Sequence, residues 1–184
     1  MRIIAGKFKG RKLNEFNIKS TRPTLDRIKE PLFSIITPYL YDAKVLDLFS
    51  GTGNLGIEAV SRGASFAWLN DMNKSALKLI LSNVRLTECE NCVKITGKEY
   101  EKCLKQIKSE DTSFDIIFLD PPYECDFETK VLKLILDYNI LNKSGIIVLE
   151  SDKRKEIDEN VPGLKLKDKR IYGRVVIRFY ELEE

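Results

Sequence analysis

The chain has 184 residues, of which 43% are hydrophobic and 32% are charged, and it contains no histidine. This composition is typical of a single globular domain rather than a disordered chain. The missing histidine excludes Ser-His-Asp and Cys-His catalysis and every histidine-ligated metal site.

The chain is expected to be cytoplasmic. No apolar run approaches the ~20 residues that a membrane span needs. The first residues lack the apolar core and cleavage site of a signal peptide. The chain has four cysteines: Cys89, Cys92, Cys103 and Cys125. In a reducing compartment they are most simply free thiols, and no metal site is expected.

The net charge of +3 is unevenly distributed. Residues 1–29 contain nine basic and two acidic side chains, giving +7, so the remaining residues sum to −4. A basic arm on a mildly acidic body favours a polyanionic partner such as RNA or DNA, although a merely solvated basic face is the alternative.

Residues 1–24 are predicted to form a basic β-hairpin arm. Arg2–Leu13 has the pattern of two short strands, with Gly6 and Gly10 at the turns or bulges. A helix over 25–36 should follow, capped by Thr24 and kinked or restarted at Pro31.

From residue 45 onward, strands alternate with helices. The apolar patterns predict strands at 45–49, 66–71, 93–96, 114–119 and 145–150, and helices at 55–62, 74–86, 100–107 and 127–138. An antiparallel hairpin at 164–172 and 174–180 should close the chain. The fold class is therefore α/β, a doubly wound and mostly parallel sheet with an antiparallel C-terminal edge.

Residues 51–56 read Gly-x-Gly-x-x-Gly between a predicted strand and a helix. This is the dinucleotide fingerprint, and Asp71, twenty residues past Gly51, could hold ribose hydroxyls. The pattern alone leaves NAD and S-adenosylmethionine open. Asp47, at the end of the first strand, would repel a pyrophosphate and attract an ammonium or sulfonium group, which favours S-adenosylmethionine.

The strand at 114–119 ends abruptly in Asp120-Pro121-Pro122-Tyr123. Prolines cannot extend a strand ladder, and ligands bind at this edge of an α/β sheet. Asp120 and the Pro121 carbonyl could each accept one hydrogen of an exocyclic amino group while Tyr123 stacks on the base. The alternative is a plain strand followed by a proline-rich turn.

Several of these segments resemble class I methyltransferases that modify exocyclic amino groups: 47–53, 58–64, Asn83 and 120–123. The N-terminal segments 2–6, 9–13 and 22–24 narrow the resemblance to the bacterial 16S rRNA (guanine-N2)-methyltransferase family, over essentially the whole chain. Residues 25–184 would then be the class I methyltransferase domain, with a Rossmann-like sheet.

The resemblance implies methylation of the N2 amino group of one guanine in small-subunit ribosomal RNA. The substrate would be RNA within a small-subunit particle or an assembly intermediate, and the enzyme would be a monomer. The alternative is an adenine-N6 DNA methyltransferase or another nucleic-acid amino-methyltransferase.

The resemblance also implies site residues. The residues implied to bind S-adenosylmethionine are Asp47, Phe49, Ser50, Gly51, Thr52, Gly53, Asp71, Glu99 and Asp120. The catalytic residues would be Asp120, Pro121, Pro122 and Tyr123. The residues implied to bind RNA are Arg2, Lys7, Lys9, Arg11, Lys12 and Arg22. Two positions depart from the family pattern. Asp71 stands where glutamate is usual, and Lys98 stands where an acid near the adenine is usual, with Glu99 next to it.

Overall fold

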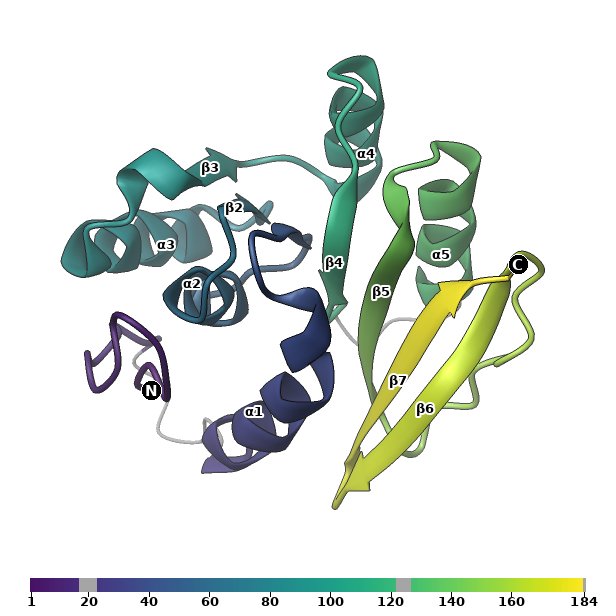
Figure 1. The fold of residues 1–184 in the computed structure, drawn as a ribbon, viewed down its shortest axis with the longest axis horizontal. Helices are drawn as coiled ribbons and strands as arrows, with labels where there is room; N and C mark the ends of the chain where they lie inside the picture. Colours follow the sequence, from purple (N-terminus) through teal and green to yellow (C-terminus); the bar gives the residue numbers. More distant parts are fainter. Residues whose placement is uncertain (17–22, 122–126, 184) are drawn as a thin grey trace.

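The computed structural model describes residues 1–16, 23–121 and 127–183. Within them, seven strands form one sheet in the order β3-β2-β1-β4-β5-β7-β6 (Figure 1). The strands are β1 (Lys44–Asp47), β2 (Phe66–Asn70), β3 (Val93–Thr96), β4 (Phe114–Leu119), β5 (Leu141–Asp152), β6 (Leu164–Tyr172) and β7 (Val175–Leu182).

The sheet has a parallel part and an antiparallel part. Strands β3, β2, β1, β4 and β5 are mutually parallel. Strand β7 runs antiparallel between β5 and β6. This confirms the predicted mixed sheet with its antiparallel C-terminal edge. The chain leaves β1 toward β2 on one side and returns to β4 on the other, which creates the switch point where such sheets bind ligands.

Helices cover both faces of the sheet (Figure 1). They are α1 (Pro23–Ile36), α2 (Asn54–Ser61), α3 (Lys74–Thr87), α4 (Tyr100–Ser109) and α5 (Phe127–Asp137), with 3-10 turns at Thr37–Tyr39 and Glu90–Cys92. Two hydrophobic clusters result. One joins α1, α2 and α3 to the face that carries Val45, Ile116 and Phe118. The other joins α4 and α5 to the opposite face, which carries Leu46, Ile117 and Leu119. Successive side chains of a strand therefore enter opposite cores, which explains the nearly continuous apolar runs.

The described part of the N-terminal arm, residues 1–16, is less regular than predicted. Its pairing is a single antiparallel bridge between Arg2 and Lys12, not two full strands. The arm nevertheless contributes Ile3, Phe8 and Leu13 to the core beside α1, α2 and α3. The arm is therefore packed on the domain.

Helix and strand bounds differ from the predictions in two informative places. Helix α1 begins at Pro23, so the prediction that Thr24 caps it was wrong; it also continues through Pro31, so of the kink or restart expected there the restart was wrong. Strand β5 is longer than predicted at both ends: it begins at Leu141, opposite Phe114 of β4, and its last residues pair with β7, where Asp152 lies opposite Val175. In the described residues, no helix combines the length and apolarity that crossing a membrane requires.

Candidate active site

Three carboxylates gather where the parallel strands end. Asp47 is the last residue of β1, Asp71 follows β2 directly and Asp120 follows β4 directly. The register places Asp47 opposite Leu69 of β2 and Phe118 of β4, so the three ends are nearly level. The sequence prediction that these acids share one edge of the sheet is confirmed.

The glycine-rich loop between β1 and α2 depends on glycine at three points. Gly51 and Gly53 have φ of +55° and +78°, and Gly53 is the N-cap of α2. A Cβ at Gly56 would lie 2.2 Å from a methyl carbon of Leu69 in β2. The loop therefore turns tightly and lets α2 approach the sheet closely.

Asp47 is almost fully buried beneath this loop. Its Oδ2 accepts a hydrogen bond of 3.1 Å from the Gly56 amide. Burial, reinforced by repulsion from Asp120 and Asp71, raises the pKa of Asp47 to about 7, although the Gly56 amide works against the shift. A buried anion among other anions is a site suited to a cationic ligand.

Asp71 and Asn70 organise the neighbouring strand end. The Asp71 carboxylate accepts hydrogen bonds from the Gly51 amide at 2.9 Å and the Asn73 amide at 2.8 Å. The Asn70 side chain donates to the carbonyls of Leu48 and Lys98, at 3.2 and 2.9 Å. Asn70, which sequence analysis missed, thus ties the loop after β3 to the end of β1.

The region outside the carboxyl ends of β1, β2 and β4 is named here the crevice, and an aromatic cluster lies beside it, next to the end of β1. The ring of Phe49 lies 6.1 Å from that of Tyr100 and 5.3 Å from that of Phe127, and the latter two rings are 4.3 Å apart. Glu99 is the exposed N-cap residue of α4, next to Tyr100. The rings of Tyr100 and Phe127 thus join α4 and α5 beside Phe49, which is a predicted cofactor residue.

The acid-proline corner is described only in part. Asp120 is half-buried and Pro121 is buried. Pro122 and Tyr123 lie outside the described residues, as do Arg22 and Cys125.

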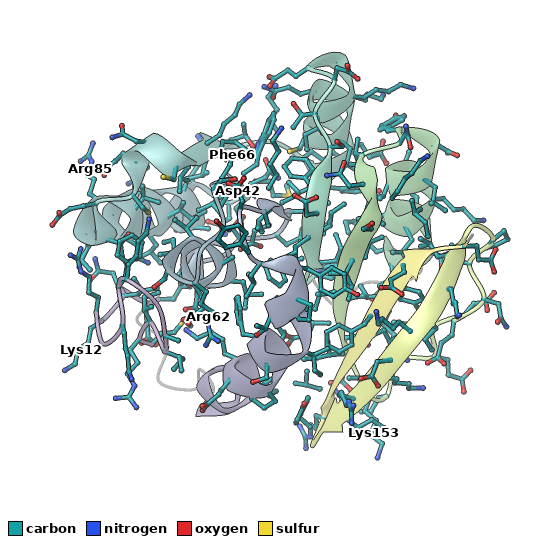
Figure 2. The ribbon with its side chains drawn as sticks, viewed as in Figure 1. Lys12, Asp42, Arg62, Phe66, Arg85 and Lys153 are labelled. Carbon is teal, nitrogen blue, oxygen red and sulfur yellow. The ribbon has the colours of Figure 1, made fainter. Side chains whose placement is uncertain are left out.

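The predicted RNA-binding residues of the arm divide into two groups. Arg2, Lys7, Lys9 and Lys12 are exposed, and Lys12 projects outward from the arm (Figure 2). Arg11 is partly engaged, because its Nη1 donates to the Leu86 carbonyl of α3 at 2.8 Å.

Comparison with known proteins places this arrangement in a family. A family model described as "Conserved hypothetical protein 95" matches residues 1–181. A Bacillus subtilis (strain 168) protein, whose name places it with rRNA methyltransferases, is 38% identical over 98% of both chains. "Ribosomal RNA small subunit methyltransferase D" of Haemophilus influenzae is 33% identical, covering 98% of this chain and 93% of its own.

The chain belongs to the ribosomal RNA small subunit methyltransferase D family.

The fold agrees with this membership. A solved structure of an Escherichia coli protein, titled as a methyltransferase, superposes with a TM-score of 0.88 at 28% identity. It covers 100% of this chain and 98% of its own.

Glu58, one of the motif residues behind the methyltransferase D resemblance, has a structural task. Its fully buried carboxylate accepts from the Ile4 and Ala5 amides at 2.9 and 3.0 Å, and pairs with Lys29 at 2.9 Å and Arg62 at 2.8 Å. Burial would raise the pKa of Glu58, but these partners outweigh it and lower that pKa. Figure 2 shows Arg62 between α2 and α1. Lys29, counted in the basic N-terminal charge, is thus buried and unavailable to RNA.

Asn83 has a similar task on α3. Its side-chain amide donates to the Thr52 carbonyl at 2.9 Å and to the Asn14 carbonyl at 3.0 Å, and its oxygen accepts from the Asn14 amide at 2.7 Å. One residue of α3 therefore joins the arm to the glycine-rich loop in this member of the methyltransferase D family.

Proposed function

We propose that this protein is an S-adenosylmethionine-dependent methyltransferase of small-subunit ribosomal RNA, acting on the N2 amino group of one guanine. The observation that carries the proposal is the acidic corner at the end of β4. It lies beside a crevice in which the buried Asp47 has the carboxylates of Asp120 and Asp71 as its charged neighbours. Ribosomal RNA as substrate is supported by the names of the relatives in Haemophilus influenzae and Escherichia coli. The family resemblance points further, to guanine 966 of 16S RNA.

The residues of the crevice fit S-adenosylmethionine. Asp47 would face the positive charge of the methionine end. The Asp71 carboxylate would accept hydrogen bonds from the ribose hydroxyls with the lone pairs that the Gly51 and Asn73 amides do not use. Backbone groups of residues 49–53 would line the loop side, and Glu99 would take the adenine side. When bound, S-adenosylmethionine supplies an electrophilic methyl group on a sulfonium.

The task of the protein is then to make a weak nucleophile reactive. The lone pair of the guanine amino nitrogen is delocalised into the ring. We assign the two amino hydrogens to the Asp120 carboxylate and the Pro121 carbonyl, which favours a tetrahedral nitrogen with a directed lone pair. Asp120 or water takes the proton that is released, and the chemistry uses no metal.

The base must also leave its stack to reach this corner. We assign Tyr123 to hold it by stacking, an interaction worth about 1–3 kcal/mol in other base-binding proteins. A guanine in a loop or in partly assembled RNA would be the cheapest to extrude.

Replacing Asp120 tests the proposal. Asp120→Ala should abolish methyl incorporation into unmodified 16S ribosomal RNA, because the acceptor for an amino hydrogen is removed. Calorimetry should show S-adenosylmethionine affinity within a few fold of wild type. The matched control is Asp137→Ala, an exposed carboxylate at the end of α5.

Wild-type rates in purified Asp120→Ala would defeat the proposed role of the corner. Incorporation by the wild type into duplex DNA, with none into ribosomal RNA, would support the adenine-N6 DNA alternative instead.

A further inference from the structure

The β6–β7 hairpin stands beside the acidic corner, on the side opposite the N-terminal arm. Leu119, the last residue of β4, lies opposite Leu149 of β5, and β5 continues for three more residues to Asp152. At about 3.3 Å per residue, this carries the end of β5 and its hairpin partners roughly 10 Å past the end of β4. Figure 1 shows the hairpin extending beyond β4 at the lower edge of the view.

The end of this hairpin, residues 152–154 and 170–174, is named here the C-terminal tip. It contains four cations (Lys153, Arg154, Arg170 and Arg174) and the single carboxylate of Asp152. The Lys153 amide donates to the Arg174 carbonyl at 2.7 Å, which fixes the end of β5 to the start of β7. The tip is therefore a defined structure with an excess of positive charge.

Two of the four cations have carboxylate partners. Arg154 donates from two nitrogens to Asp152 at 2.9 and 2.8 Å, and Arg170 bonds to Asp168 at 2.9 Å. The bonds from Arg154 lower the pKa of Asp152 to about 2. Lys153 and Arg174 are exposed, and neither forms an ion pair with another residue in the described part of the chain. Their charge is available to an anion.

The tip also exposes an apolar side chain. Ile171 is 52% exposed, next to Arg170 and two residues before the turn at Gly173. Figure 2 shows Lys153 at the same end of the hairpin. Cations interleaved with an apolar side chain suit a ribose-phosphate backbone with an unstacked base better than an acidic protein surface, because the base supplies an apolar face.

We propose that the C-terminal tip is a second RNA-contacting surface. In the sheet order, β5 separates β4 from β7, so the tip lies about 10 Å to the side of the Asp120 corner. The RNA phosphates next to the target guanine bind Lys153 and Arg174, while the N-terminal arm binds the RNA on the other side. This inference rests on the proposed function, since it takes the substrate to be RNA.

The test is Lys153→Gln with Arg174→Gln, measured as binding to an unmodified 16S ribosomal RNA transcript across a salt series. Loss of two phosphate contacts should weaken binding about five- to thirtyfold. It should also reduce the slope of log affinity against log salt by roughly 1.4–1.8. Melting temperature and S-adenosylmethionine affinity should match wild type.

The control is Lys133→Gln with Lys143→Gln, which changes the net charge equally. Both lysines are exposed, one on α5 and the other near the opposite end of β5. Equal RNA affinity and equal salt slope in the two double variants would overturn the inference. Weakened binding with an unchanged salt slope would also overturn it, because the loss of phosphate contacts must reduce that slope.

The two proposals fail separately. A wild type that methylates RNA and a tip variant that binds like the control would defeat the tip alone. A wild type that binds RNA through the tip but transfers no methyl group would defeat the proposed function alone.

Discussion

At the scale of single residues, Asp47 has the electrostatic surroundings that best suit the proposed cationic ligand. The folded state raises its pKa from 3.8 to about 7, chiefly by burial. The folded protein thus retains a proton that the unfolded chain releases near pH 4. The contribution of Asp47 to stability therefore falls as the pH rises from about 4 to about 7, and stays low above that.

Asp47→Asn should remove this penalty. Urea unfolding should show the free energy of unfolding of the variant rising relative to wild type between pH 5 and pH 8, while S-adenosylmethionine affinity falls because the attracting charge is gone. Asp137→Asn, exposed on α5, should change neither quantity. A stability difference that does not vary with pH would contradict the account of Asp47.

Glu58 holds the arm through hydrogen bonds to two of its backbone amides. Replacing a buried carboxylate by an amide leaves the ammonium of Lys29 buried without its counter-ion. Glu58→Gln should therefore lower the free energy of unfolding by roughly 3–5 kcal/mol, measured by urea denaturation at neutral pH.

The control for Glu58 is Glu101→Gln, which breaks the solvent-exposed pair with Lys130. It should shift the denaturation midpoint little, since exposed pairs contribute little to stability. Equal effects of the two substitutions would show that the Glu58 cluster does not hold the arm.

At the scale of elements, the arm and α2 meet at a glycine. A Cβ at Gly6 would lie 1.8 Å from the Ser61 carbonyl oxygen, which itself accepts from the Lys7 amide at 2.8 Å. Phe8 donates its amide to the Ser61 hydroxyl at 2.9 Å. Glycine at this position is required by the close approach as well as by its φ of +80°.

Gly6→Ala should therefore release the arm from α2. Amide hydrogen exchange at Lys7 and Phe8 should accelerate roughly tenfold or more, because their acceptors on Ser61 are displaced. Gly10→Ala is the matched control: Gly10 has a similar φ of +86°, but nothing lies within 4 Å of its Cβ position. Equal exchange rates in the two variants would show that backbone strain alone, and not the close approach to Ser61, causes the effect.

Sequence patterns predicted the elements well where a periodic apolar run ends at a clear turn or proline signal. The predicted bounds of β3, β4 and β6 are those of the structure, since each is an apolar or alternating run closed by a turn or a proline. The prediction for β1 ran two residues too far, because Phe49 belongs to the loop that turns toward α2. The docking of the arm could not be predicted, since Glu58 and the Ala5 amide are 53 residues apart.

The candidate site was predictable to a similar degree. Asp47, Asp71 and Asp120 were found because strand ends and a glycine fingerprint mark them. Asn70 and Tyr100 were missed because their contacts depend on neighbours that only the folded chain brings together. Asn70 bridges two loops, and the Tyr100 ring packs at a tilt against Phe49.

At the scale of the whole molecule, one sheet edge carries the acidic crevice, with the N-terminal arm on one side and the C-terminal tip on the other (Figure 1). The arm reaches the crevice itself, because Asn83 joins Asn14 to Thr52 and the Thr52 hydroxyl contacts the Met1 sulfur at 3.7 Å. In the proposed function, basic surfaces on two sides of the acidic crevice would keep phosphate binding apart from the cationic cofactor.

Nucleoside mass spectrometry of ribosomal RNA tests the central claim most directly. Small-subunit RNA from cells lacking the gene should be short of one N2-methylguanosine, and the purified wild-type protein with S-adenosylmethionine should restore it while Asp120→Ala does not. An unchanged N2-methylguanosine content in those cells, or a restored mark that proves to be N6-methyladenosine, would contradict the account.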